Sequence, residues 1–131
     1  MSDRDERILV CLDSILDECN LIRDIIARFP SADSYAGTLD GIMAFRTLCN
    51  CEQNIAEASN RLIRYAGESF TENHPEVPWP AIRGMRNRIV HEYLEFDHNV
   101  IINTALYDIP SIVPLFEALK DEFLLTTDVS Q

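Results

Sequence analysis

The stretch "GMRNRIVHEY", from Gly84 to Tyr93, combines side chains that can bind a phosphate and move a proton. Histidine has an ordinary pKa of about 6.5, so it can both donate and accept a proton near neutral pH. Arginine offers a planar fork of donors that fits phosphate oxygens. The pair Arg86 and His91 therefore suits metal-independent RNA cleavage, in which the ribose 2′-OH attacks the adjacent phosphorus. In this hypothesis His91 moves the proton, Arg86 stabilises the transition-state charge, and Asn87 orients the histidine ring or binds the substrate.

The helical register of this stretch places these residue types together. At about 100° per residue, one arc of roughly 160° carries polar and apolar residues alike: Arg86, Asn87, Val90, His91, Tyr93 and Leu94. Arg88 and Glu92 fall on the opposite side and are typical of a solvated face. The mixed arc indicates a site that is partly buried or closed by a partner. An isolated Arg-x4-His on a helix is nevertheless common, and by itself it more often belongs to an ordinary helix surface.

Other candidate chemistry in the sequence is weak. His74 and His98 have no comparable neighbours and are interpreted as structural or solvent-exposed. The sequence lacks the paired Glu-x-x-His motifs with inward carboxylates that a di-metal bundle needs, and we expect neither a metal nor a cofactor. The four cysteines lack the C-x-x-C spacing of zinc or redox motifs. They are expected to act as small buried hydrophobic residues: Cys11, Cys19, Cys49 and Cys51.

The charge distribution points to one localised anion site. The 131 residues carry a formal net charge of −11, which argues against nonspecific coating of nucleic acid. Residues 61–91 are the exception, with five arginines against three acidic residues. Between Trp79 and His91 there are three arginines and no acid. One positive segment in an acidic chain predicts a focused site rather than a basic surface.

Hydrophobic periodicity predicts helices throughout the first half of the chain. Residues 8–29 repeat apolar side chains at steps of three and four before Pro30, which predicts one long helix. Residues 31–38 read as a loop. A second pattern over 39–66, starting with Leu39 and Ile42, weakens near 49–53 and predicts one bent helix or two. Residues 67–80 contain Gly67 and three prolines and predict a connection.

The second half of the chain is predicted to be helical as well. Pro80 suits the first turn of a helix that runs to Phe96, and Asp97 suits the N-cap of the next helix. Pro110 and Pro114 should kink or interrupt that helix, and residues 125–131 are expected to form a frayed tail. Together these patterns predict an all-α antiparallel helical bundle of about five helices, forming a single domain over 1–131. The chain has an apolar fraction of 47%, which is typical of globular proteins.

The sequence also predicts a cytoplasmic protein. No apolar run approaches the roughly 18 residues that span a bilayer, so no membrane association is expected. The first residues, "MSDRDERILV", are mixed in charge and do not read as a signal or transit peptide.

A larger motif makes the interpretation more specific. The segment "HPEVPWPAIRGMRNRIVHEY" resembles the signature region of the HepT-like proteins of the HEPN superfamily. That pattern is a Trp, an Ile-x-Gly before Arg-Asn, and Arg-x4-His-x-Tyr. The sequence contains all of these positions: Trp79, Ile82, Gly84, Arg86, Asn87, His91 and Tyr93. The resemblance extends more loosely over the whole chain, including "NIAEASNRL" and "YDIPSIVPLFEAL".

This resemblance implies an activity and a set of partners. HepT-like toxins are metal-independent endoribonucleases, here with mRNA or tRNA as substrate, whose motifs face each other across a homodimer cleft. The two copies of His91 would then share the acid and base roles. The usual partner is a minimal, MntA-like nucleotidyltransferase antitoxin that transfers AMP to the motif tyrosine, here Tyr93. An alternative from another class remains open, namely a noncatalytic helical binding partner of such a nucleotidyltransferase.

Overall fold

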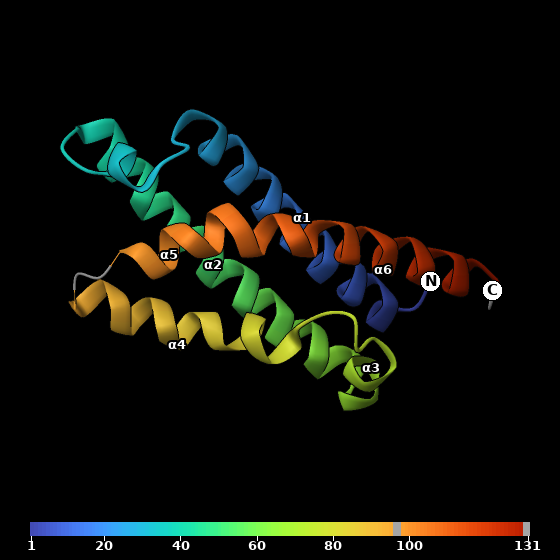
Figure 1. The fold of residues 1–131 in the computed structure, drawn as a ribbon. Helices are drawn as coiled ribbons and strands as arrows, with labels where there is room; N and C mark the ends of the chain where they lie inside the picture. Colours follow the sequence, from blue (N-terminus) through green and yellow to red (C-terminus); the bar gives the residue numbers. More distant parts are fainter. Residues whose placement is uncertain (96–97, 130–131) are drawn as a thin grey trace.

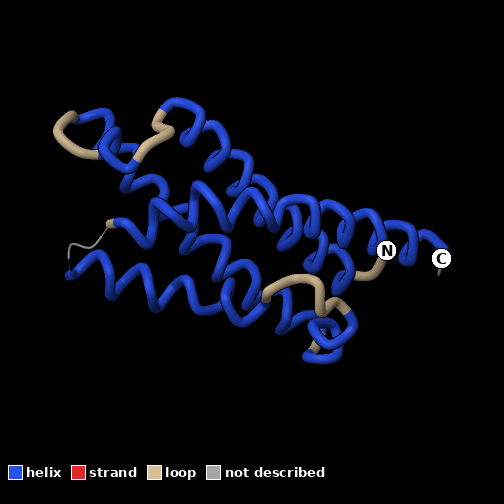
Figure 2. Tube along the Cα trace, in the orientation of Figure 1, coloured by secondary structure: helices blue, strands red, loops and turns tan. Residues whose placement is uncertain are grey.

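The computed structural model describes residues 1–95 and 98–129, with the backbone alone for 88–95, 128 and 129. Four long helices alternate in direction along the bundle (Figure 1): α1 (Asp3–Arg28), α2 (Leu39–Ala66), α4 (Trp79–Glu95) and α6 (Ile109–Val129). Shorter elements lie between them: η1 (Ala32–Tyr35), α3 (Glu68–Asn73), α5 (Asn99–Asn103) and the π-helical turn η2 (Thr104–Asp108). No strand occurs in the described part of the chain (Figure 2). The predicted all-α bundle is confirmed.

Helix α1 ends close to the predicted boundary before Pro30 and begins at Asp3, five residues before the predicted stripe. The Ser2 side chain accepts a hydrogen bond from the Asp5 amide, and the Asp5 carboxylate accepts one from the Ser2 amide, which forms a capping box. The helix buries one apolar stripe: Ile8, Cys11, Leu12, Ile15, Cys19 and Ile22. Helices α2 and α6 pack against α1. The bundle core therefore forms around this stripe.

Helix α2 is one continuous helix, which settles the open question about residues 49–53. Its interior there is filled by Cys51 and Ile55, both fully buried, so packing sustains the helix where the apolar pattern weakens. At the first turn, the Thr38 side chain accepts a hydrogen bond from the Gly41 amide. A Cβ on Gly41 would lie 2.5 Å from the carbonyl oxygen of Ser34, so a side chain is excluded.

The start of α2 differs from the sequence prediction, whereas its end agrees with it. Leu39 and Ile42, which the periodicity assigns to its buried stripe, are 72% and 44% exposed, because the first turns of α2 bury another face, with Gly41, Ala44 and Phe45. At the other end, Gly67 adopts a positive φ of 91° that terminates the helix. There the guanidinium of Arg4 donates to the carbonyl oxygens of Tyr65 and Ala66, at 2.6 and 2.8 Å. Helix α1 thereby caps the C-terminus of α2.

The connection over 67–80 is partly helical. It contains α3, a helix of six residues that the glycine and prolines had not predicted. Similarly, the predicted loop over 31–38 contains the single turn η1. Pro80 lies in the first turn of α4, as predicted, since a proline there removes no helical hydrogen bond.

The C-terminal segment is continuously helical despite its two prolines. The chain passes from α5 through η2 into α6, and Pro114 lies inside α6. Pro110 has no amide to donate to the Leu106 carbonyl, and directly before it the Ile109 amide bonds to Thr104 at π-helical spacing. The predicted proline kink is thus accommodated by a π turn. His98 occupies the N-cap position of α5, and the predicted cap Asp97 and the predicted helix end Phe96 lie outside the described residues.

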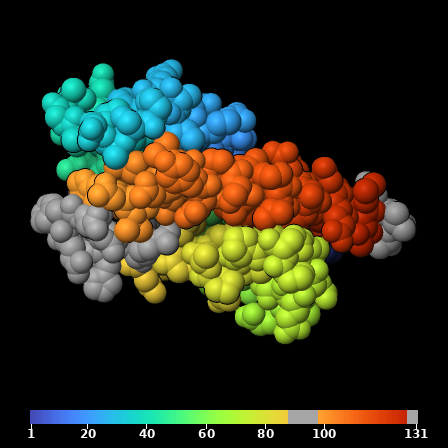
Figure 3. All heavy atoms as spheres, viewed as in Figure 1, coloured from blue at the N-terminus to red at the C-terminus, as the bar shows by residue number. Residues whose placement is uncertain are grey.

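The predicted frayed tail from residue 125 is wrong up to Val129, where α6 ends. The Thr127 side chain is buried, and its hydroxyl donates to the Phe123 carbonyl, which holds the last turn in place. One stretch, Asn99–Thr127, does meet the length and hydropathy of a membrane span, contrary to the sequence prediction. Part of this stretch packs in the bundle core, to which α6 contributes Ile112, Phe116 and Leu119. Figure 3 shows α5 to α6 as a band across one face of the molecule.

Candidate functional site

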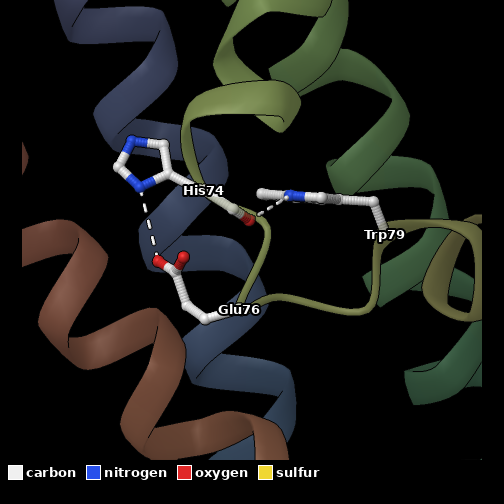
Figure 4. A network of polar contacts seen from close by, with 3 residues as sticks. All are labelled: His74, Glu76 and Trp79. Carbon is white, nitrogen blue, oxygen red and sulfur yellow. Dashed lines mark hydrogen bonds and ion pairs between the residues drawn. The ribbon is translucent and has the colours of Figure 1, made fainter.

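The start of α4, which carries the predicted motif, is held by the loop that precedes it (Figure 4). The indole nitrogen of Trp79 donates to the carbonyl oxygen of His74 at 3.0 Å, and the His74 ring nitrogen Nδ1 lies 3.4 Å from a Glu76 carboxylate oxygen. The Trp79 ring is 4% exposed and packs edge-on against Phe116 of α6. Trp79 therefore ties α4 to α6 and sets where the helix begins.

Helix α4 then directs two kinds of residue to different faces. Ile82 and Met85 are each 3% exposed and belong to the core, which fixes the rotation of the helix. Arg83 and Arg86 are consequently exposed beside α2. The Arg83 guanidinium donates to the Asn60 side-chain oxygen at 3.0 Å.

Arg86 lies next to a carboxylate that the sequence motif does not include. Its Nε atom is 3.8 Å from a Glu57 carboxylate oxygen, and the two side chains are 57% and 34% exposed. That oxygen also accepts a hydrogen bond of 3.4 Å from Gln53. The ion pair is solvent-accessible and therefore weak, so an anionic ligand can compete for Arg86. Asn87 is exposed on the same helix.

Arg86 lines a hollow of about 540 Å³ between α2 and α4. Four arginines line it: Arg61, Arg64, Arg83 and Arg86. Glu57, Glu68 and Asn60 line it as well. Four guanidinium groups against two carboxylates leave the hollow with an excess of two positive charges, although the chain carries −11. This arrangement suits a ligand with more than one negative charge.

The structure describes two of the predicted site residues by their backbone alone. His91 and Tyr93 belong to α4, whose backbone is helical through Glu95, but their side chains lie outside the described residues. The helix does confirm that positions 86, 87, 91 and 93 share one unbroken element. The other two histidines have structural contacts: His74 as above, and His98 through stacking on Phe45 with ring centroids 4.0 Å apart.

The structure adds residues that the motif search missed. Arg61 and Arg64 come from α2 and join the motif helix only in the folded chain. The positive segment over 61–91 was the available signal for them, because it contains all four arginines of the hollow. Glu57 and Asn60 gave no signal in the sequence, since their role depends on the pairing of α2 with α4.

Glu52 is another residue without a sequence signal. The contacts from Asn60 to Arg83 and from Glu57 to Arg86 show that three residues back along α2 correspond to three forward along α4. In this antiparallel register, Glu52 lies at about the level of position 91. Its side chain is 0% exposed, which is rare for a carboxylate and requires compensating polar contacts.

The cysteines behave mainly as core residues. Cys11, Cys19 and Cys51 are buried and Cys49 is half-buried, as predicted. Burial raises the pKa of the Cys19 thiol to about 12, so this thiol stays protonated near neutral pH. Within the described residues, no three His, Cys, Asp or Glu side chains are grouped so that they could hold a metal ion.

The structure is thus a helical bundle in which an arginine-lined hollow lies beside the Arg-Asn motif of α4. Residues 15–119 match the family model described as Ribonuclease HepT-like. The chain belongs to this HepT-like ribonuclease family, which confirms both the predicted family and the predicted class of enzyme, an RNA endonuclease.

Relatives of similar length support this membership. The chain is 29% identical over 101 residues to a protein of Caldanaerobacter subterraneus subsp. tengcongensis assigned as an RNase, covering 77% of this chain and 83% of that one. It is 30% identical over 112 residues to a protein of Methanocaldococcus jannaschii with the same assignment, covering 86% and 94%. A protein of Thermococcus cleftensis assigned as ribonuclease HepT is 32% identical over 77 residues, covering 53% and 70%. No solved structure matches the chain significantly.

Proposed function

We propose that this protein is a metal-independent endoribonuclease toxin that acts on cytoplasmic RNA through Arg86, Asn87 and His91. The observation that carries the proposal is the position of Arg86. It stands at the edge of a hollow with excess positive charge, five residues before His91 on the same unbroken helix. Family membership supplies the reaction class, and the local charge supplies a reason for a phosphodiester to bind here.

The reaction needs one base, one acid and one cation. The 2′-oxygen attacks the phosphorus as a histidine removes its proton, and the bond from phosphorus to the 5′-oxygen breaks as a second histidine protonates that oxygen. The products are a 2′,3′-cyclic phosphate and a free 5′-hydroxyl. Arg86 stabilises the extra charge of the pentavalent transition state. A homodimer supplies both histidines as the two copies of His91, with Asn87 orienting the ring.

Regulation in this proposal acts through Tyr93. A nucleotidyltransferase encoded as the antitoxin of a type VII-like pair transfers AMP to its hydroxyl. Tyr93 follows Arg86 by two helical turns, so an added phosphate on that face competes with RNA for the guanidinium and repels the RNA backbone. The modified protein is therefore inactive.

The test is cleavage of total RNA and of tRNA in excess EDTA by chain whose intact mass shows no adduct on Tyr93. We expect cleavage by the wild type and none by His91→Ala or Arg86→Gln. His98→Gln and Arg28→Gln are matched controls, because they remove a histidine and an arginine outside the proposed site. Circular dichroism checks that each variant is folded. Absence of cleavage by unmodified wild type would reject the proposal and favour the noncatalytic partner of a nucleotidyltransferase.

A further inference from the structure

The arginines of the hollow form two short ladders. Arg61 and Arg64 are three residues apart on α2, and Arg83 and Arg86 are three residues apart on α4. Side chains at this spacing lie on the same helix face, with Cβ atoms about 5–6 Å apart. The two ladders line one hollow, one from each helix.

The acidic side chains around the hollow neutralise only part of the positive charge of these arginines. Glu57 lies beside Arg86, and Arg83 has the neutral Asn60 as its hydrogen-bond partner. Among the described residues, no carboxylate forms an ion pair with Arg64. Positive charge that is exposed and not neutralised internally is costly to gather in one place, and a bound polyanion offsets the repulsion.

The hollow also extends in a defined direction from the proposed scissile site. Arg83, Arg64 and Gly67 lie toward the start of α4 and the end of α2, away from position 91. The residues lining the hollow include no aromatic side chain, so it offers no platform on which bases could stack. The available contacts are charge-assisted hydrogen bonds to phosphate oxygens.

We infer that this hollow binds the sugar-phosphate backbone of the RNA on one flank of the cleaved bond, with Arg64 and Arg83 holding phosphates next to the one at Arg86. The inference rests on the proposed function and names a substrate-binding subsite for it. Because the contacts are to phosphates, the subsite binds RNA regardless of its sequence and loses affinity as salt rises. Longer strands that fill the subsite bind more tightly than dinucleotides.

The test measures binding of a fluorescent single-stranded RNA of 12 nucleotides by anisotropy, from 50 to 300 mM salt. The full-length chain carries His91→Ala so that the RNA remains intact. Arg64→Gln with Arg83→Gln is compared with Arg23→Gln and Arg28→Gln, which remove the same charge from exposed positions on α1. Thermal melting establishes that both double variants fold.

We expect the subsite double variant to bind about tenfold more weakly than the α1 control at 50 mM salt. Its slope of log affinity against log salt should be smaller by roughly 1.4, because each phosphate contact to a single strand contributes about 0.7. Equal affinity of the two double variants would overturn the inference. The hollow would then be a binding site for an acidic protein surface instead of RNA. Absence of measurable RNA binding by the His91→Ala chain would overturn it as well.

Cleavage assays separate this inference from the proposed function. With His91 intact, the subsite double variant should raise KM and leave kcat nearly unchanged, since neither arginine touches the reacting phosphate. If the wild type binds RNA through Arg64 and Arg83 but never cleaves it, the subsite stands and the ribonuclease proposal fails. If the wild type cleaves RNA with a KM insensitive to both substitutions, the subsite fails and the ribonuclease proposal stands.

Discussion

Replacing Glu57 by glutamine tests whether Arg86 is held for an anion. Glu57 forms an ion pair with Arg86, at 3.8 Å from its Nε atom, and it lines the same hollow. Glutamine has the same shape and keeps an oxygen that can accept the hydrogen bond from Gln53. The substitution therefore removes one negative charge from the proposed RNA site while changing the packing little.

The magnitude follows from Coulomb's law. A phosphate oxygen bound to Arg86 on the side away from Glu57 would lie roughly 7 Å from that carboxylate, given the 3.8 Å ion pair and a hydrogen bond of about 3 Å. At this separation the repulsion is about 0.6 kcal/mol in water and about 1.2 kcal/mol at half that dielectric constant. Both side chains are partly exposed, so values in this range apply. Glu57→Gln should tighten RNA binding about three- to sevenfold at low salt.

The assay is the anisotropy titration in the His91→Ala chain, with Glu117→Gln as the matched control. Glu117 is an exposed carboxylate on α6, outside the hollow. The gain should shrink as salt rises from 50 to 300 mM, because the Debye length falls below the separation of the charges within this range. The free energy of unfolding should change by less than about 0.5 kcal/mol, since the ion pair is solvent-accessible. Equal or weaker RNA binding by Glu57→Gln would refute the view that Arg86 binds the RNA phosphate.

Three further predictions concern the scaffold. Arg4→Met removes two hydrogen bonds to the last carbonyls of α2 and should lower the free energy of unfolding by about 1–2 kcal/mol in urea titrations, whereas Arg28→Met should not. Gly84→Ala should raise the free energy of unfolding by about 0.5–1 kcal/mol, because an added Cβ meets no atom within 4 Å. Destabilisation by this substitution would contradict the exposed helical position of Gly84. The buried thiol of Cys19 has its pKa raised from 9.0 to about 12, so its stabilising contribution is complete below pH 9 and is lost between pH 9 and 12. The free energy of unfolding, measured against pH, should fall in this window, and its slope should be smaller in Cys19→Ala than in the wild type. Equal slopes in the two proteins would contradict the burial of Cys19.

The features that could be predicted from the sequence depend on residues that are close together along the chain. Helix α1 could be predicted from its sequence because its buried stripe repeats at helical spacing and Pro30 follows its end, whereas its start at Asp3 was not predicted. The same holds for Arg86, Asn87, His91 and Tyr93, which one helix carries at fixed spacing. These are local relations, and each depends on neighbouring residues.

Interactions between helices were not accessible in this way. The exposure of Leu39 and Ile42 depends on which face of α2 packs into the core, and the last turn of α6 places the side chain of Thr127 in a buried position. In both places the packing of the helix against the rest of the molecule decides the outcome. The residue pattern within one helix therefore cannot predict it.

The candidate site divides along the same line. The sequence by itself determined the helical class, the motif on α4 and the positive segment over 61–91 in an acidic chain. Only the tertiary structure decided that Arg61 and Arg64 face Arg83 and Arg86 across one hollow, and that Glu57 lies beside Arg86. The physical reason is that helical spacing fixes neighbours along one helix, whereas the packing of apolar faces fixes which helix lies alongside it and in what register.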